Sequence, residues 1–331
     1  MLVGGIMAVV GGLVSAGAVW LVIVNARRLG LVQSPNARSS HVRPTPTGGG
    51  IGIVVGAVVG CIPLITGDAL AFAIPAAAAL CLAALGLWDD LRPLPAGVRL
   101  LAQLVIVGAA CFLVRVPWPS PLLPAVAIVV LVGWINLFNF MDGIDGLAGS
   151  EAIFLLLAPL LVAALGNPHA LDGQLVWIPI VVAAAVLGFL AFNWQPARIF
   201  MGDVGSVFLG GVTGALALGE LFAGWLSPWQ VLILFGCFLA DGGLTLGRRA
   251  AHGERVWEAH RRHAYQNLSR RVGSHGKIVL GVIAIDLVWL LPLAVLAGML
   301  SPAGAAGLTV IAYLPLVAIA FFAGAGRPEH A

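Results

Sequence analysis

Residues 122–146 read LLPAVAIVVLVGWINLFNFMDGIDG, an apolar run that ends in a series of amides and carboxylates. A helix that crosses a bilayer needs about 20 mostly apolar residues. This stretch is long enough, and its polar side chains gather at one end. It therefore predicts a membrane-spanning helix whose polar end lies at a membrane surface.

The composition extends this prediction to the whole chain. Of its 331 residues, 60% are hydrophobic and 9% are charged, and the mean hydropathy is +1.04. A water-soluble domain carries roughly a quarter charged residues. We therefore expect an all-α integral membrane protein, folded as a single polytopic domain over residues 1–331. The four cysteines lie within apolar runs, and we interpret them as small hydrophobic residues rather than disulfide or metal sites.

About eleven apolar runs have the length and composition of spanning helices. They cover residues 2–24, 48–66, 69–88, 98–116, 122–141, 152–166, 174–192, 206–222, 229–247, 278–299 and 302–324. The first run is long and no basic segment precedes it, so we interpret it as a span rather than a cleaved signal peptide.

The basic residues orient these spans. With eleven spans, 16 of the 17 lysines and arginines fall on one side of the membrane, and only Arg115 falls on the other. The 16 are Arg27, Arg28, Arg38, Arg43, Arg92, Arg99, Arg198, Arg248, Arg249, Arg255, Arg261, Arg262, Arg270, Arg271, Lys277 and Arg327. Because cytoplasmic loops carry an excess of basic residues, we predict a periplasmic N-terminus and a cytoplasmic C-terminus.

Most of the acidic residues fall on the same predicted cytoplasmic side. Its loops cover about residues 25–47, 89–97, 142–151, 193–205 and 248–277, and they bring together Asp89, Asp90, Asp142, Asp145 and Asp203, with Asn136 and Asn139 close by. Single acids at a membrane edge are ordinary solvated groups. Five aspartates from three loops beside many arginines instead predict a site for a metal-bound polyphosphate.

Two segments carry most of this signal. In the first, Asn136, Asn139, Asp142 and Asp145 recur every third residue, and intramembrane asparagine is costly unless it is paired or functional. In the second, residues 193–206, glycines flank Asp203 at the start of an apolar run. Backbone N–H groups at such a helix start can bind an anion. The alternative is that Asp203 or Ser206 simply caps the helix.

The loop 248–277 contains eight basic residues, two acidic residues and four of the seven histidines. A basic loop beside a membrane is often only a topology determinant that contacts anionic lipid. For His260 and His263, three residues apart, we favour diphosphate binding. A zinc site is not expected, because no third ligand lies at a suitable spacing.

Taken in order, these motifs resemble those of the polyprenyl-phosphate N-acetylhexosamine-1-phosphate transferases. The resemblance covers about residues 34–268. It comprises Ser34–His41 with Pro44–Gly50, Asp89-Asp90, Asn136–Gly146, Met201–Ser206 and the histidine loop, which reads His-Arg-Arg-His-Ala-Tyr-Gln from His260. That last motif is most similar to the branch that initiates O-antigen chains.

The resemblance implies a reaction. An N-acetylhexosamine 1-phosphate would pass from a UDP-sugar, UDP-GlcNAc or a related UDP-N-acetyl-deoxyhexosamine, to undecaprenyl phosphate, with release of UMP. This step would initiate O-antigen or another cell-envelope polysaccharide at the cytoplasmic face of the bacterial inner membrane. Membrane lipid is an expected partner and nucleic acid is not, while a homodimer is left open.

It also implies residue roles. Asp203 and Asn139 would hold Mg²⁺, with Mn²⁺ as an alternative, and Asp89 and Asp90 would orient or deprotonate the acceptor phosphate. Substrate contacts are implied for Asn136, Asp142, Asp145, Arg99, His260, Arg262, His263, Arg43 and Ser206. Because the acceptor is a phosphate that is largely ionised at neutral pH, we favour one-step displacement over a covalent aspartyl intermediate.

Two other classes of protein remain as alternatives. A secondary transporter also has many spans and intramembrane acids, but it places them near the midplane. Here Asp241 and Asp286 are the two acids within spans that fit such a protein, and Asp286 has no role in the predicted site. A lipid-binding scaffold would bind polyprenyl phosphate without metal-dependent exchange.

Overall fold

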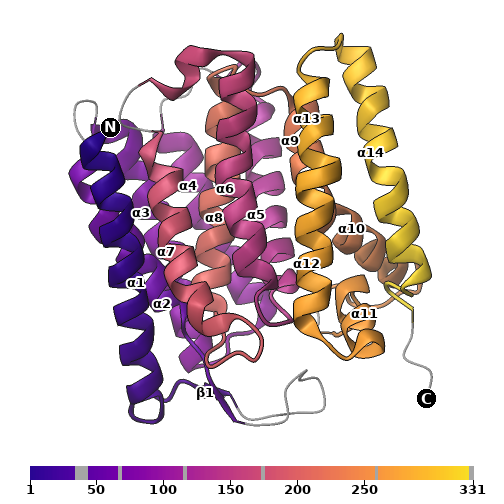
Figure 1. Ribbon diagram of the computed structural model, residues 1–331. Coiled ribbons are helices and arrows are strands. Elements are labelled where there is room, and N and C mark those ends of the chain that lie inside the picture. The colour runs from indigo at the N-terminus through magenta and orange to yellow at the C-terminus, as the bar shows by residue number, and fades with distance from the viewer. Residues whose placement is uncertain (34–43, 66–68, 115–117, 173–175, 258–259, 328–331) are drawn as a thin grey trace.

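The computed structural model describes residues 1–33, 44–65, 69–114, 118–172, 176–257 and 260–327. Almost all of this chain is helical, as Figure 1 shows. Two short strands, β1 (Val32–Gln33) and β2 (Thr45–Pro46), pair antiparallel. The fold is therefore that of an all-α integral membrane protein.

Eight helices form the larger part of the molecule. They are α1 (Leu2–Leu29), α2 (Gly50–Cys61), α3 (Ala69–Leu91), α4 (Ala96–Leu113), α5 (Leu123–Met141), α6 (Leu147–Gly166), α7 (Trp177–Asn193) and α8 (Asp203–Phe222), with short 3₁₀ turns η1 (Ile62–Leu64) and η2 (Pro168–Leu171). We call α1–α8 the N-terminal bundle. Within it, α8 packs against α3 and α5, and α1 packs against α2 and α7.

The rest of the chain forms a second group beside this bundle (Figure 1). It contains α9 (Pro228–Leu234), α10 (Gly236–Ala251), α11 (Ala264–Val272), α12 (His275–Ile285), the π-helical turn η3 (Asp286–Leu290), α13 (Leu291–Ala297) and α14 (Pro302–Phe322). We call α9–α14 the C-terminal unit. It contacts the bundle through α5 and α6.

The predicted spans coincide with these helices. Among the described residues, eight helices are long and apolar enough to cross a membrane, and α9 and α10 add a ninth span if the bent pair is counted as one. Two shorter apolar helices, Gly50–Leu64 and Trp177–Asn193, lie on the two remaining predicted runs. The count of eleven and the orientation stay predictions.

Two predicted runs differ from the observed helices. The run 229–247 was expected to be one straight span, but it is divided into α9 and α10, which are bent by 77°. The run 152–166 begins earlier, at Leu147, because α6 includes the buried polar residues Ser150 and Glu151 that interrupt the apolar pattern.

Close backbone approach holds the start of α2 against the turn before α8. The N–H groups of Gly49 and Gly50 donate to the carbonyls of Phe200 and Met201, both at 2.9 Å. A Cβ atom on Gly50 would lie 2.2 Å from Cα of Gly205. The start of α2 is therefore docked on the turn that leads into α8.

Candidate active site

Asp90, near the end of α3, caps the N-terminus of α8. Its Oδ1 accepts the N–H of Asp203 at 2.9 Å, and its Oδ2 accepts that of Val204 at 3.0 Å. The first N–H groups of a helix lack intrahelical partners and favour a negative charge. The preceding Gly202 has φ 75°, and a Cβ there would lie 2.6 Å from Asp90. The capping role that the sequence suggested for Asp203 or Ser206 thus belongs to Asp90.

Asp89, Arg99 and Asp203 meet beside this cap. Arg99 Nη1 lies 2.6 Å from Asp89 Oδ2 and 3.1 Å from Asp203 Oδ2. The carboxyl groups of Asp89 and Asp203 are themselves within hydrogen-bonding distance. Two carboxylates this close repel each other unless a positive charge compensates. In this structure the guanidinium of Arg99 supplies that charge.

Asn139, on the last turn of α5, adds an amide to the cluster. Its Nδ2 lies 3.4 Å from Asp203 Oδ2, and its Oδ1 accepts from the hydroxyl of Ser206 at 2.9 Å. The same hydroxyl lies 3.3 Å from the carbonyl of Gly202. Rotating the amide by 180° would turn Oδ1 toward Asp203 and let Ser206 accept from Nδ2 while donating to Gly202.

These side chains fit a magnesium ion of the kind that is shared with a substrate. The carboxylates of Asp89 and Asp203 and the rotated amide of Asn139 are hard oxygen donors. Mg²⁺ commonly binds one or two protein carboxylates together with substrate phosphates. Over the described part of the chain, no three His, Cys, Asp or Glu side chains are arranged to hold a metal. The donor set thus suits a metal that completes its shell with substrate and water.

Two predicted site residues make contacts elsewhere. Asn136 donates to Gln103 Oε1 at 2.5 Å and to the carbonyl of Val132, and so joins α5 to α4. Asp145 accepts the N–H of Ala197 at 3.0 Å and lies 3.3 Å from His275 Nδ1. Arg43 lies outside the described residues, as does the motif 34–41.

Asp142 lies just after α5, in the turn before α6. Burial, reinforced by the negative charges of Asp90 and Asp145, raises the pKa of Asp142 to about 7. Its carboxyl group therefore titrates near neutral pH and would be sensitive to a cation bound nearby.

His263 is held at the start of α11 by a buried carboxylate. Asp241 Oδ1 lies 3.1 Å from His263 Nδ1 and accepts the N–H of Ala264 at 2.9 Å, while Oδ2 accepts that of Tyr265 at 3.0 Å. His263 is only 1% exposed. Its Nε2 has no hydrogen-bond partner among the described residues.

His260 stacks on His263, with ring centroids 4.8 Å apart. Its burial, together with electrostatic repulsion from His263, Arg249 and Arg262, lowers the pKa of His260 to about 3. The ring is therefore neutral at pH 7. Because Nδ1 accepts the N–H of Arg262 at 3.4 Å, the proton lies on Nε2, which is buried and also lacks a partner within the described chain.

Arg262 is paired within its own loop. Its Nη1 donates to Glu254 Oε1 at 2.6 Å, and the Nε of Arg249 donates to Glu254 Oε2 at 3.0 Å. These two guanidinium groups lower the pKa of Glu254. The predicted contact of Arg262 with substrate would have to coexist with this ion pair.

The end of α5 connects the aspartate cluster to the histidine pair. Asn139 contacts Asp203, and the carbonyl of the next residue, Phe140, accepts from the hydroxyl of Tyr265 at 2.9 Å. The ring of His260 lies 6.1 Å from that of Phe140. The motifs that contain Asn139, Asp203 and the histidine pair are therefore connected through the end of α5.

Comparisons with known proteins agree with this assembly of motifs. A model of glycosyl transferase family 4 matches residues 72–220. The decaprenyl-phosphate N-acetylglucosaminephosphotransferase of Mycobacterium tuberculosis is 30% identical over 298 residues, covering 77% of this chain and 73% of the relative. The chain belongs to glycosyl transferase family 4.

Two further relatives are also transferases that are named for N-acetylated sugars. A probable undecaprenyl-phosphate N-acetylglucosaminyl 1-phosphate transferase of Bacillus subtilis is 28% identical over 278 residues, 80% of this chain and 76% of the relative. The phospho-N-acetylmuramoyl-pentapeptide-transferase of Thermosynechococcus vestitus is 34% identical over 249 residues, 65% and 62% of the two chains. The resemblance to the polyprenyl-phosphate N-acetylhexosamine-1-phosphate transferases is thus confirmed.

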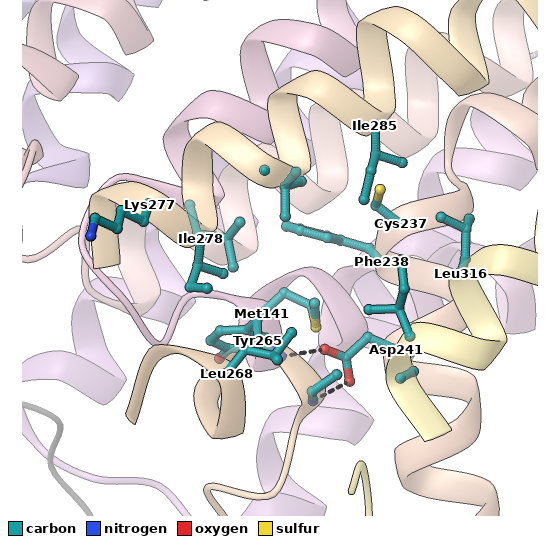
Figure 2. A pocket seen from close by; sticks show the side chains of 16 residues that line it. Met141, Cys237, Phe238, Asp241, Tyr265, Leu268, Lys277, Ile278, Ile285 and Leu316 are labelled. Carbon is teal, nitrogen blue, oxygen red and sulfur yellow. Dashed lines mark hydrogen bonds between the residues drawn. The ribbon is translucent and has the colours of Figure 1, made fainter. Parts of the chain in front are cut away.

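This member of family 4 has an apolar cavity beside the histidine loop (Figure 2). Its volume is about 170 Å³, and it lies between α10, α11, α12 and α14. Cys237, Phe238, Ile285 and Leu316 line its apolar walls, and Asp241 lies at its polar edge. An apolar cavity that meets polar groups at one edge suits an amphipathic ligand.

Tyr265 and Asp241 are the site residues of this family 4 chain that the sequence analysis did not assign. Tyr265 is buried and bonds to the end of α5, and Asp241 fixes the start of α11. Asp241 was noted only as an acid within a span. Its isolation in an apolar run was a signal of a buried partner, but the partner lies 22 residues away.

Proposed function

We propose that this chain transfers an N-acetylhexosamine 1-phosphate from a UDP-sugar to undecaprenyl phosphate, giving undecaprenyl-diphosphate-sugar and UMP. One observation carries the proposal most strongly. The carboxyl groups of Asp89 and Asp203 lie in contact beside Arg99 and Asn139, so this cluster favours a bound cation. The end of α5 links the cluster to a buried histidine pair, whose two Nε2 atoms have no hydrogen-bond partner among the described residues. Such a site suits a diphosphate that shares a metal with the protein.

The reaction needs no strong base. An ionised oxygen of the acceptor phosphate attacks the β-phosphorus of the UDP-sugar, the bond from that phosphorus to the bridging oxygen breaks, and UMP leaves with the electron pair. Such transfers depend on positioning and on neutralisation of phosphate charge. A Mg²⁺ ion held by Asp203 and Asn139 would supply part of that neutralisation.

The geometry separates the roles of the two neighbouring aspartates. Both oxygens of Asp90 accept backbone N–H groups of α8, so this residue positions Asp203. Asp89 faces Arg99 and Asp203 instead. We therefore propose that Asp89 orients the acceptor phosphate and that Asp90 acts through Asp203.

The histidine pair is proposed to contact the diphosphate or the nucleotide. A neutral His260 that is protonated on Nε2 presents one N–H donor from a buried position. A donor of this kind binds a phosphate oxygen without adding a full charge. We place the isoprene unit next to the acceptor phosphate at the apolar cavity of Figure 2, whose volume of about 170 Å³ suits a group of that size, and the rest of the polyprenyl chain in the surrounding lipid.

The sugar is proposed at the level of a class. UDP-GlcNAc is favoured because the relatives from Bacillus subtilis and Mycobacterium tuberculosis are named for N-acetylglucosamine. Initiation of O-antigen and a cytoplasmic-facing site in the bacterial inner membrane are further parts of the proposal. They rest on the motif order and the distribution of basic residues.

The experiment is a substrate panel in liposomes. Purified protein is incubated with undecaprenyl phosphate and a series of UDP-sugars, and the lipid product is identified by mass spectrometry. We expect undecaprenyl-diphosphate-N-acetylhexosamine with one or a few UDP-N-acetylhexosamines. Counterflow of a labelled solute without any lipid product would instead favour a transporter.

The one-step mechanism has its own test. With UDP-sugar and labelled UMP but no undecaprenyl phosphate, direct displacement predicts no exchange of label into the UDP-sugar. Exchange under those conditions, or recovery of a phosphorylated Asp89 or Asp90, would show a covalent intermediate.

A further inference from the structure

Two carboxyl groups are buried together where the C-terminal unit contacts the N-terminal bundle. Glu151 on α6 and Asp286 at the start of η3 are each 1% exposed. Their side chains lie within hydrogen-bonding distance of each other. Neither takes part in the site described above, and both lie within helices long enough to span the membrane.

This carboxyl pair lacks donors. Both Glu151 oxygens and Asp286 Oδ1 have no hydrogen-bond partner among the described residues. The thiol of Cys237, on α10, is within hydrogen-bonding distance of Asp286. Two carboxylates cannot donate to each other, and a buried unpaired charge is strongly unfavourable. Their contact therefore requires at least one proton between them.

Among the described residues, no basic side chain acts on the pair; on α12, His275 contacts Asp145 and Lys277 lines the apolar cavity. On the elements packed against the pair, α10 contributes Cys237 and Asp241, and α14 contributes Tyr313, whose hydroxyl donates to the carbonyl of Leu232. The carboxylate of Asp241 is occupied by α11. Helices α9 and α13 carry no titratable side chain. No basic group acts on the pair within the described chain.

The pair lies at the contact between the C-terminal unit and the N-terminal bundle. Helix α6 packs against α9, α12 and α13, so it is a main contact of the C-terminal unit with the bundle. η3 follows α12, and the two residues 273 and 274 link α12 to α11, which begins just after His263 and contains Tyr265. Tyr265 bonds to the carbonyl of Phe140 on α5, next to Asn139, and the aspartates of the site lie on α3 and α8 of the bundle.

We propose that Glu151 and Asp286 share a single proton and act as positioning residues, fastening the C-terminal unit, with its histidine loop, against the bundle that carries the aspartates. The role of the loop rests on the proposed function, whereas the shared proton does not. The pair is a mixed acid and carboxylate, with the Cys237 thiol donating to the Asp286 side.

Infrared spectroscopy counts the proton directly. Protonated carboxylic acids have a carbonyl stretch separate from that of carboxylates, and its intensity is calibrated by acidifying the protein. At pH 7, the Glu151→Gln/Asp286→Asn double variant should lose the intensity of one carboxylic acid. The exposed Asp172→Asn variant should lose none. Loss of two groups, or of none, would overturn the shared proton.

The pH dependence of stability gives a second readout. The folded wild type keeps a proton that ordinary carboxyl groups release on unfolding, so its Tm should fall as the pH rises above about 4. In the double variant this part of the slope should disappear. A Tm that rises with Na⁺ at constant ionic strength in the wild type alone would identify a cation site and refute the proposal.

Activity separates positioning from simple stability. Glu151→Gln and Asp286→Asn each keep a hydrogen bond between these two side chains. UMP release by either variant should therefore stay within about threefold of wild type. Glu151→Ala and Asp286→Ala should lower kcat about tenfold or more in protein that remains folded by circular dichroism. Equal loss in the amide and alanine variants would contradict positioning. An inactive wild type would refute the proposed function but leave the infrared count decisive.

Discussion

Asp203 is the side chain on which the contacts of the site converge. It touches Arg99, Asn139 and the carboxyl group of Asp89, and its backbone N–H is bonded to Asp90. The sequence identified all five residues as parts of one site, because each lies at the predicted polar end of a span. It did not predict that Asp90 caps α8 or that Asn136 bonds to Gln103, because those partners lie far away along the chain.

Removal of one metal-binding group tests the assignment of Asp203 and Asn139. Asp203→Asn or Asn139→Ala should lower UMP release by at least about 100-fold, since each removes an oxygen donor from the proposed ion. Expression and Tm should change little. Asp172→Asn, an exposed acid in another part of the chain, serves as the control. Near-normal turnover in either site variant would refute the metal assignment.

Ser206 tests the orientation of the Asn139 amide. Its hydroxyl is the partner that permits either orientation, so Ser206→Ala should weaken the apparent affinity for Mg²⁺ by several-fold with a smaller effect on kcat at saturating metal. A titration of activity against Mg²⁺ measures both the apparent affinity for the metal and kcat at saturating metal. An unchanged metal dependence would show that the hydroxyl does not support the amide.

Asp142 gives the site a pH-dependent contribution to stability. Burial raises its pKa to about 7, so the folded state keeps a proton that the unfolded state loses above about pH 4. This contribution is complete below about pH 4 and is lost as the pH rises to about 7. Asp142→Asn cannot ionise, so in EDTA its Tm should vary less than that of wild type over this range. Parallel Tm curves would contradict the prediction.

At the scale of elements, the hydropathy pattern predicted where most helices lie, but not the bend between α9 and α10 or the start of α6. The runs of apolar residues predicted α1, α3, α4, α5, α8 and α14 closely, because lipid contact requires an uninterrupted apolar surface. The 77° bend between α9 and α10 and the early start of α6 were not predictable. The bend falls at Phe235, inside an apolar run, and α6 begins with Ser150 and Glu151 in its first turns, which interrupt the apolar pattern.

The contact between α2 and α8 tests how elements position the site. A Cβ on Gly50 would lie 2.2 Å from the backbone of Gly205, so Gly50→Ala should displace the turn before Asp203 and lower stability by about 2 kcal/mol or more, with a loss of activity. Gly133→Ala is the matched control, since a Cβ there meets nothing within 4 Å. Thermal unfolding in detergent and UMP release measure the two effects. Equal behaviour of the two variants would show that the close approach does not matter.

At the scale of the whole molecule, basic residues lie at helix ends on one side. The ends of α1, β1 and α11 lie at the same end of the molecule, opposite the N-terminus (Figure 1). Arg27 and Arg28 close α1, and Arg270 and Arg271 close α11, in agreement with one basic face. The count of basic residues predicted one basic face, and its orientation in the membrane stays a prediction. The contact of Glu151 with Asp286 could be found only in the structure.

The central claim is that metal-assisted transfer to a polyprenyl phosphate takes place at the Asp89–Asp203 cluster. The most direct measurement is UMP release from UDP-GlcNAc and its N-acetylhexosamine analogues in liposomes, with and without undecaprenyl phosphate and Mg²⁺. We predict release only when lipid acceptor and metal are both present, with loss in Asp203→Asn and retention in Asp172→Asn. Release that is independent of the acceptor or of Mg²⁺, or that persists in Asp203→Asn, would contradict the account.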